Sequence, residues 1–306
     1  LIIKHGSLGD LIQANGAIKD IKRHYNHSKV ILLTSQAFSL FMSECDYIDG
    51  VITDKRLPRW NLFYLLNLKN LLARYNFTHV YDLQNSSRSK FYRKFLLNKS
   101  IWSSSETILE KDQKKIDFDK EPVLDRMEIQ LKKSYIPTKY VNNIDLSWAI
   151  EDISRLIKQY SNGEFILIFP FCSLKHENKR WPFYRDLILK IKKEFKNKYP
   201  ILVAPGPGEI NEAKNLGVKI VLEDNKAINI KKLISLIYNA KYIVSNDTGP
   251  AHIASHLKKK GLVLFGSHTS AKKVSIENYN FKALNSKNLA NLDVDTVMKE
   301  IKAYLN

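Results

Sequence analysis

The chain has 306 residues, of which 44% are hydrophobic, and its formal net charge at pH 7 is +18. This length predicts about two domains, and no apolar run approaches the ~20 residues that a membrane-spanning helix needs. The two cysteines are too few for a disulfide framework and favour a reducing, cytoplasmic setting. No spacing typical of zinc fingers or RNA-binding domains is present, so we expect no nucleic-acid partner.

The first half of the chain alternates short apolar runs with helix-like stretches. Strands are predicted at 1–3, 30–33, 51–52 and 79–83, and helices at 11–25 and 62–75. This alternation is typical of a parallel sheet. Residues 98–146 are less regular and contain one helix-like run near 127–133.

A connecting helix is predicted at 150–160, and the alternation then restarts. Strands are predicted at 164–171, 201–206, 218–222, 242–247 and 262–266, with helices at 183–196, 209–216, 230–239 and 250–257. We predict an α/β fold of two doubly wound, Rossmann-like domains, 1–150 and 151–291, followed by a C-terminal helical segment at 292–306. Ligands of such sheets bind at the carboxyl ends of the strands.

The first strand-end loop, "KHGSLGDLIQANG" (4–16), places Gly9 and Asp10 at a helix start. Gly9 would let a ligand approach the backbone closely. Asp10 is either an N-cap or a carboxylate that acts as a general base. The loop lacks the G-x-G-x-x-G order, and no acidic residue ends the second strand, so we do not expect a dinucleotide site.

A second loop, "FPFCSLKHENKRWPF" (169–183), brings Lys179 and Arg180 to a helix start. Two cations there suit a diphosphate, although a solvated basic loop would look the same. Trp181 is expected to pack in the core. Cys172 has no Cys–His–acid partner set and is not expected to be a nucleophile.

Two further loops follow strands. "APGPGE" (204–209) ends on Glu209, which either accepts from ribose hydroxyls or complements a helix dipole.

"SNDTGPAHIASHL" (245–257) sets Asp247, Thr248 and Gly249 at a strand-to-helix junction, where helix N–H groups suit a phosphate. An ordinary N-cap is the alternative. His252 and His256 have the i, i+4 spacing of a zinc pair, but no glutamate lies between them. We expect His252 to face an anion at the helix start and His256 to be structural.

Four motifs, "GSLGDLIQANGAIKDIKRHY", "KRWP", "GPGE" and "NDTGPAHIASHL", resemble in order and spacing those of the bacterial ADP-heptose:lipopolysaccharide heptosyltransferases, glycosyltransferase family 9. "YDLQNSSRSKF" (81–91) is similar to a further family segment. The resemblance implies a GT-B fold, in which an N-terminal acceptor domain faces a C-terminal nucleotide-sugar domain across a cleft and the C-terminal helix returns to the first domain. This chain departs from the family pattern at Asn15-Gly16 and at Ser267-His268-Thr269.

The implied reaction is inverting transfer of heptose from ADP-heptose to the lipopolysaccharide inner core, with no metal and no cofactor. The resemblance implies Asp10 as the general base and Lys179 as the cation that neutralises the leaving diphosphate. It implies donor contacts from Gly9, Ser173, Glu209, Asp247, Thr248, Gly249 and His252. Arg88, Lys90 and Arg93 are candidates for contact with an anionic acceptor, unless they only form a solvated helix face.

The expected partners are a nucleotide sugar, a lipopolysaccharide core or lipid A acceptor, and the anionic surface of the inner membrane. The expected location is the cytoplasm, at the periphery of that membrane's inner face. The basic composition is also consistent with drift on a solvated surface. A GT-B enzyme with another sugar-nucleotide donor, or a non-catalytic nucleotide-binding module of the same fold, are the competing hypotheses.

Overall fold

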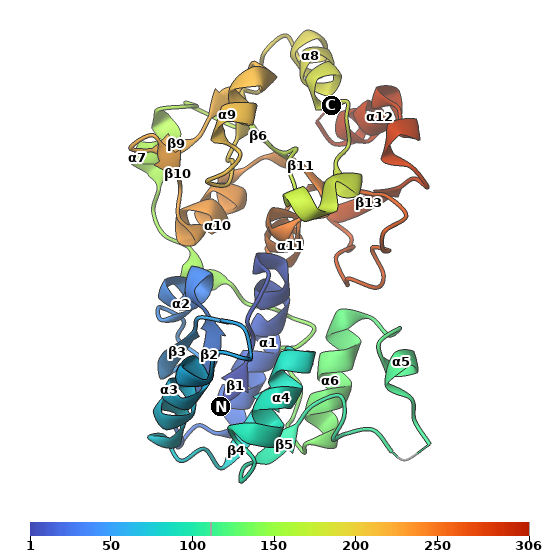
Figure 1. The fold of residues 1–306 in the computed structure, drawn as a ribbon. Helices are drawn as coiled ribbons and strands as arrows, with labels where there is room; N and C mark the ends of the chain where they lie inside the picture. Colours follow the sequence, from blue (N-terminus) through green and yellow to red (C-terminus); the bar gives the residue numbers. More distant parts are fainter. Residues whose placement is uncertain (111, 306) are drawn as a thin grey trace. The chain divides into compact units, whose positions relative to one another are not determined.

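The computed structural model describes residues 1–110 and 112–305, with the backbone alone at 174 and 175. Contacts divide the chain into two units, Leu1–Trp148 and Ala149–Asn306. Each unit is an α/β structure built on its own parallel sheet (Figure 1). Within the described residues, no helix combines the length and apolar content required to cross a membrane.

The first unit contains a five-stranded sheet in the order β3-β2-β1-β4-β5, with all neighbours parallel. Its strands are β1 (Ile2–Ile3), β2 (Ile31–Ser35), β3 (Gly50–Asp54), β4 (His79–Asp82) and β5 (Ile101–Ser103). Its helices are α1 (Leu8–His24), α2 (Gln36–Met42), α3 (Leu62–Ala73), α4 (Ser87–Phe95), α5 (Lys115–Phe118) and α6 (Val123–Lys133). The chain moves outward from β1 to β3 and then returns to β4 on the other side, so the strand order reverses between β1 and β4.

Helix α1 is buried along most of its length, which explains two residues that its sequence pattern did not. At Gly16 a Cβ atom would lie 2.1 Å from Tyr140 O, so only glycine lets the two backbones pack this closely. One turn later, the buried Asp20 carboxylate accepts hydrogen bonds from the backbone N–H groups of residues 139, 140 and 141. Both contacts fix α1 against the segment that leads out of the first unit.

The second unit contains a six-stranded sheet in the order β13-β12-β11-β6-β7-β8, again with parallel neighbours. Its strands are β6 (Ile166–Phe169), β7 (Ile201–Val203), β8 (Lys219–Ile220), β11 (Tyr242–Asn246), β12 (Gly261–Phe265) and β13 (Phe281–Asn285). A small hairpin pairs β9 (Leu222–Glu223) with β10 (Lys226–Ala227). Strands β6, β11 and β12 are buried at every residue, as expected for central strands covered on both faces.

The helices of the second unit pack over this sheet (Figure 1). They are α7 (Ser154–Lys158), α8 (Tyr184–Glu194), α9 (Ile210–Ala213), α10 (Ile230–Asn239), α11 (Gly249–His256) and α12 (Val294–Leu305), with 3-10 turns η1 (Ser147–Ala149), η2 (Leu174–Lys179), η3 (Lys214–Leu216) and η4 (Leu289–Asn291). Trp181 is 1% exposed and lies in the core, as predicted. Val297 and Ile301 of α12 join the same core. The return of α12 to the first unit stays a prediction, and residue 306 lies outside the described chain.

Two sequence predictions are wrong. The predicted connecting helix at 150–160 is reduced to η1 and the five residues of α7. The predicted strand at 218–222 is broken at Val221, because β8 pairs with β7 whereas β9 turns away to pair with β10. Helix α2 and strands β5 and β13 were not predicted; their short or polar sequences carry little periodic signal.

Candidate functional site

The strand-end loops of three neighbouring strands carry the predicted donor residues of the second unit. Ser173 and Lys179 follow β6, Glu209 follows β7, and Asp247 follows β11. Strands β6 and β11 are neighbours at the point where the strand order reverses, and open α/β sheets bind ligands at such a point. Lys179 and Asp247 therefore mark the expected ligand position of this sheet.

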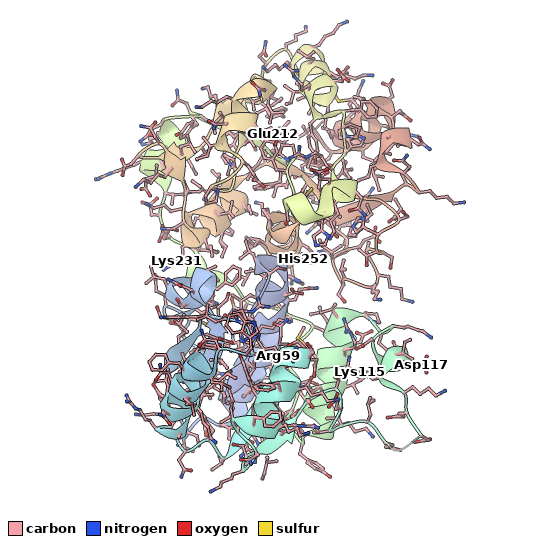
Figure 2. The ribbon with its side chains drawn as sticks, viewed as in Figure 1. Arg59, Lys115, Asp117, Glu212, Lys231 and His252 are labelled. Atoms are coloured by element: carbon pink, nitrogen blue, oxygen red, sulfur yellow. The ribbon has the colours of Figure 1, made fainter. Side chains whose placement is uncertain are left out.

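The Asp247 carboxylate is the centre of a charged cluster. Lys179 Nζ lies 2.7 Å and His268 Nε2 lies 2.9 Å from Asp247 Oδ2. His252 Nε2, on α11 (Figure 2), lies 3.8 Å from Oδ1. The side chain of Asp247 is 4% exposed, whereas that of Lys179 is 23% exposed. The cluster therefore presents its lysine, rather than its carboxylate, to solvent.

The surroundings of Asp247 keep it ionised. Burial opposes its charge, but the hydrogen bond from Lys179 and the charge of His252 outweigh that effect, so the pKa of Asp247 is lowered. The hydrogen bond from His268 acts in the same direction. At neutral pH the ionised carboxylate holds the Lys179 ammonium beside the start of α11. The predicted contact of Asp247 with a donor sugar stays a prediction.

Helix α11 begins with N–H donors that no group of the described residues accepts. Thr248 is its N-cap and has an extended backbone. Pro250 has no N–H, and the N–H groups of Ala251 and His252 both donate to Thr248 O. Within the described chain, the backbone N–H groups of Thr248 and Gly249 have no hydrogen-bond partner. These are the two residues predicted to bind phosphate, and an anion is the natural partner for such groups.

Glu209 closes the turn after β7. Its Oε2 accepts from the N–H of Gly206 at 2.7 Å, and burial raises the pKa of the carboxyl group. Oε1 has no hydrogen-bond partner among the described residues, which leaves one oxygen for a ligand hydroxyl. Arg180 is not part of the Asp247 cluster, because its guanidinium forms two parallel hydrogen bonds with Glu212 of α9 (Figure 2).

The other polar side chains near the carboxyl ends of these strands are less suited to catalysis or ligand binding. Ser173 is exposed and is the N-cap of η2. Burial raises the pKa of Cys172, and its Sγ donates to His176 O, so a thiolate is not favoured there. Burial also lowers the pKa of His256 to about 3, which keeps that imidazole neutral. Over the described residues, no group of three or more His, Cys, Asp or Glu side chains is arranged to hold a metal ion.

The first unit carries Gly9 and Asp10 in the loop between β1 and α1. Asp10 Oδ2 accepts from both the backbone N–H and the hydroxyl of Ser7, each at 3.0 Å. The N-cap of α1 is Ser7, and Asp10 is the third helical residue of a capping box, so the alternative that Asp10 is itself the N-cap is wrong. The other carboxylate oxygen accepts no hydrogen bond from the described residues, and the side chain is half-buried. One oxygen of Asp10 is therefore still available for contact with a substrate. Its role as a general base stays a prediction.

A buried lysine lies behind this loop. Lys4 Nζ donates to Leu83 O at 3.0 Å, which ties the end of β1 to the end of β4. Burial lowers the pKa of Lys4, while the charges of Asp10 and Asp82 raise it. Lys4 therefore lies within electrostatic reach of both Asp10 and Asp82.

The three cations of α4 that were predicted to contact the acceptor substrate make different contacts in the structure. Arg88 donates to Tyr92 Oη and to the carbonyls of residues 56 and 57. Lys90 and Arg93 pair with Glu106, at 2.8 Å and 3.3 Å. A pocket of about 260 Å³ adjoins this pair, and Lys90, Arg93 and Glu106 line it together with Ser86, Ser104 and Lys115. The structure therefore groups Lys90 and Arg93 at one pocket and assigns Arg88 to the support of a loop.

Sequence reasoning missed His268 and the buried Asp54. His268 follows β12 and reaches Asp247 only because β12 lies next to β11. The sequence feature that could have identified His268 is the segment Ser267-His268-Thr269, where the chain departs from the family pattern at the end of a strand. Asp54 ends β3 and accepts from Tyr92 Oη at 2.6 Å, with Tyr64 Oη and His5 Nε2 also bound to it. Burial opposes its ionisation, but these donors lower its pKa.

Comparison with known proteins shows that the chain matches a protein family. The family model described as glycosyltransferase family 9 (heptosyltransferase) matches residues 65–301. The chain is 24% identical over 303 residues to the lipopolysaccharide heptosyltransferase 1 of Campylobacter coli, covering 91% of this chain and 87% of that protein.

Solved structures show the same fold. The heptosyltransferase WaaC of E. coli with ADP superposes with a TM-score of 0.72 at 17% identity, covering 99% of this chain and 98% of that one. A family 9 glycosyltransferase from Veillonella parvula superposes with a TM-score of 0.76 at 15% identity, covering 99% and 96% of the two chains. These matches confirm the predicted GT-B fold.

Proposed function

This chain belongs to glycosyltransferase family 9 (heptosyltransferase), and from that premise we propose that it moves heptose from ADP-heptose to a hydroxyl group of the lipopolysaccharide inner core with inversion at the anomeric carbon. One relative is named a lipopolysaccharide heptosyltransferase, and one similar structure holds ADP. These names support lipopolysaccharide as the acceptor class and an adenine nucleotide in the donor.

In the proposed step, the Asp10 carboxylate takes the proton of the acceptor hydroxyl. The acceptor oxygen forms a bond to the anomeric carbon, and the bond from that carbon to the β-phosphate oxygen breaks. ADP leaves with the electron pair. A base positioned in this way contributes about 10²–10⁴-fold to a rate. The second carboxylate oxygen of Asp10, which accepts no hydrogen bond from the described residues, supports this assignment.

The leaving diphosphate is stabilised by groups of the second unit. Lys179 supplies a positive charge, and Thr248 and Gly249 supply N–H donors. Fixed cations and N–H groups can replace a metal ion in this task, so the proposed mechanism uses none. His252 stands behind the phosphate site, and Ser173 and Gly9 are further donor contacts. Glu209 holds the ribose through its Oε1.

The observation that carries the proposal is the Lys179–Asp247 pair beside two unsatisfied N–H groups. A carboxylate that holds a lysine next to a helix start makes a ready site for a diphosphate. The pocket at Lys90 and Arg93 is proposed to receive an anionic sugar or phosphate of the acceptor. Such an acceptor places the protein in the cytoplasm, at the inner face of the membrane that holds the lipid.

A release assay tests the proposal. The protein is mixed with a Kdo-lipid A acceptor and with ADP-heptose, or with UDP and GDP sugars as matched controls, and the freed nucleotide is measured. We expect release of ADP only when donor and acceptor are both present, at a rate unchanged by EDTA. Release of UDP or GDP would identify another donor. Nucleotide binding without any transfer would indicate a binding module, and loss of activity in EDTA with recovery in Mg²⁺ would contradict the metal-free step.

A further inference from the structure

One surface of the first unit is apolar although nothing in the described chain covers it. Helix α3 buries Tyr64, Leu65, Leu68 and Leu72 in the core. Its opposite face is polar at Asn67, Lys69 and Asn70 but apolar over 62–66. There and in the loop before it, Trp60 is 79%, Leu62 69%, Phe63 78% and Leu66 59% exposed. A contiguous exposed apolar patch of this kind marks an interaction site. We call residues 55–66 the docking segment.

The docking segment is also strongly basic. Residues 55–81 contain five cations and no acidic residue: Lys55, Arg56, Arg59, Lys69 and Arg74. Three of the five lie within the loop that precedes α3. Aromatic and aliphatic side chains flanked by Lys and Arg are typical of segments that rest in the headgroup region of a membrane. Each such cation near an anionic bilayer adds electrostatic attraction.

The loop of the docking segment is braced from beneath. Arg88 donates to the carbonyls of Arg56 and Leu57, and Asp54 accepts from the N–H of Arg56. Arg59 reaches the start of α4 (Figure 2), where its Nη1 donates to Ser87 O at 3.4 Å. A loop held in one conformation loses less entropy when it binds, so its exposed Trp60 is presented as an anchor.

We propose that the docking segment binds the surface of an anionic phospholipid bilayer, with Trp60, Leu62, Phe63 and Leu66 inserted among the headgroups. A second copy of the chain is the poorer occupant. A symmetric dimer would place this patch against itself and set its cations face to face, with no acidic residue between 55 and 81 to separate them. The proposal goes beyond sugar transfer and does not depend on which sugar is moved.

Vesicle binding tests the proposal. The protein is sedimented with vesicles of phosphatidylethanolamine and phosphatidylglycerol, and with vesicles of phosphatidylcholine alone. We expect binding to the anionic vesicles only, weakened by salt. The Trp60→Ser/Phe63→Ser variant should bind about tenfold less tightly or worse, because two inserted aromatic side chains are lost. The matched control is Leu189→Ser/Tyr279→Ser, which removes side chains of the second unit that are 65% and 91% exposed; its binding should not change.

Two further readouts keep the result unambiguous. Brominated lipids should quench the fluorescence of the wild type, and the Trp60→Phe variant should lose most of that quenching. Transfer to a delipidated, water-soluble acceptor should be the same in the wild type and in Trp60→Ser/Phe63→Ser. Vesicle binding without any sugar transfer would refute the proposed function and leave the docking surface standing. Equal vesicle binding by both double variants, or a dimer in solution that only Trp60→Ser/Phe63→Ser abolishes, would overturn the membrane proposal.

Discussion

Asp10 and Asp247 occupy similar positions in the folds of the two units but differ in burial and in their hydrogen-bond partners. Each follows a parallel strand and lies at the start of a helix, next to the point where the strand order reverses. Asp247 is buried and held by Lys179 and His268. Asp10 is half-buried, and among the described residues its carboxylate accepts hydrogen bonds from Ser7 alone, three residues earlier in its own loop.

The different surroundings suit the same type of side chain, an aspartate, to two different roles. A carboxylate surrounded by cations has a lowered pKa and is a poor proton acceptor, so Asp247 serves to position Lys179. A carboxylate with one free oxygen can accept a proton from a substrate, which is the role proposed for Asp10.

The largest effect is expected at Asp10. Asp10→Asn preserves the size of the side chain and the cap oxygen but removes the base, so kcat should fall by about 10²–10⁴-fold. Asp46→Asn, at an exposed carboxylate of the same unit, is the control and should keep its activity. The measurement is single-turnover transfer. A loss of only a few-fold would mean that the base is another group.

The next largest effect is expected at Lys179. Lys179→Met removes the charge that faces the diphosphate and should weaken ADP binding by about 10–100-fold, the value of a hydrogen bond to a charged group. Calorimetric titration with ADP measures it. Lys193→Met, at an exposed lysine of α8, should bind ADP as the wild type does. Unchanged affinity in Lys179→Met would make the Lys179–Asp247 pair purely structural.

The response of the second unit to acid should depend on His256. The pKa of His256 is lowered from 6.5 to about 3, so its contribution to stability is complete above pH 6.5 and is lost as the pH falls toward 3. The slope is at most about 1.4 kcal/mol per pH unit. Glu209, with its raised pKa, opposes this trend.

In the first unit, the pKa of Asp54 is lowered, so its stabilising effect is lost only below the ordinary value of 3.8. Between about pH 7 and about pH 5 the first unit responds instead through the Leu1 amino group, because burial lowers its pKa to about 5. Hydrogen exchange should show that the His256→Leu variant flattens the pH dependence of the second unit and leaves that of the first unit unchanged. A pH dependence of the second unit that His256→Leu does not change would contradict the assignment.

The smallest effect is expected at the acceptor pocket. Arg93→Gln leaves Lys90 to pair with Glu106 and removes one partly exposed cation. The KM for a phosphorylated or acidic acceptor should rise only a few-fold, and more at low salt, as for other charges at the rim of a site. Steady-state kinetics with a varied acceptor measure this. An unchanged KM at low salt would support the simpler view of a solvated helix face.

The sequence predicted the alternating elements and the loops that carry Asp10, Lys179, Glu209 and Asp247, because strand-end loops follow from local patterns. It could not predict which loops meet. The contact of His268 with Asp247 depends on the adjacency of β11 and β12, which lie many residues apart in the chain.

The contacts of Arg88 could not be predicted from the sequence for the same reason. Its partners are the carbonyls of residues 56 and 57, which follow a different strand. A basic residue after a strand looks like a ligand contact until the loop that it supports is known. Gly16 is similar, since the close backbone of Tyr140 explains it only in three dimensions.

The most direct test of the central claim is hydrogen exchange with and without ADP. We expect ADP to slow exchange of the Thr248 and Gly249 amides and of the loop that carries Lys179. Slowed exchange confined to residues 4–10, with no change at the start of α11, would contradict the account.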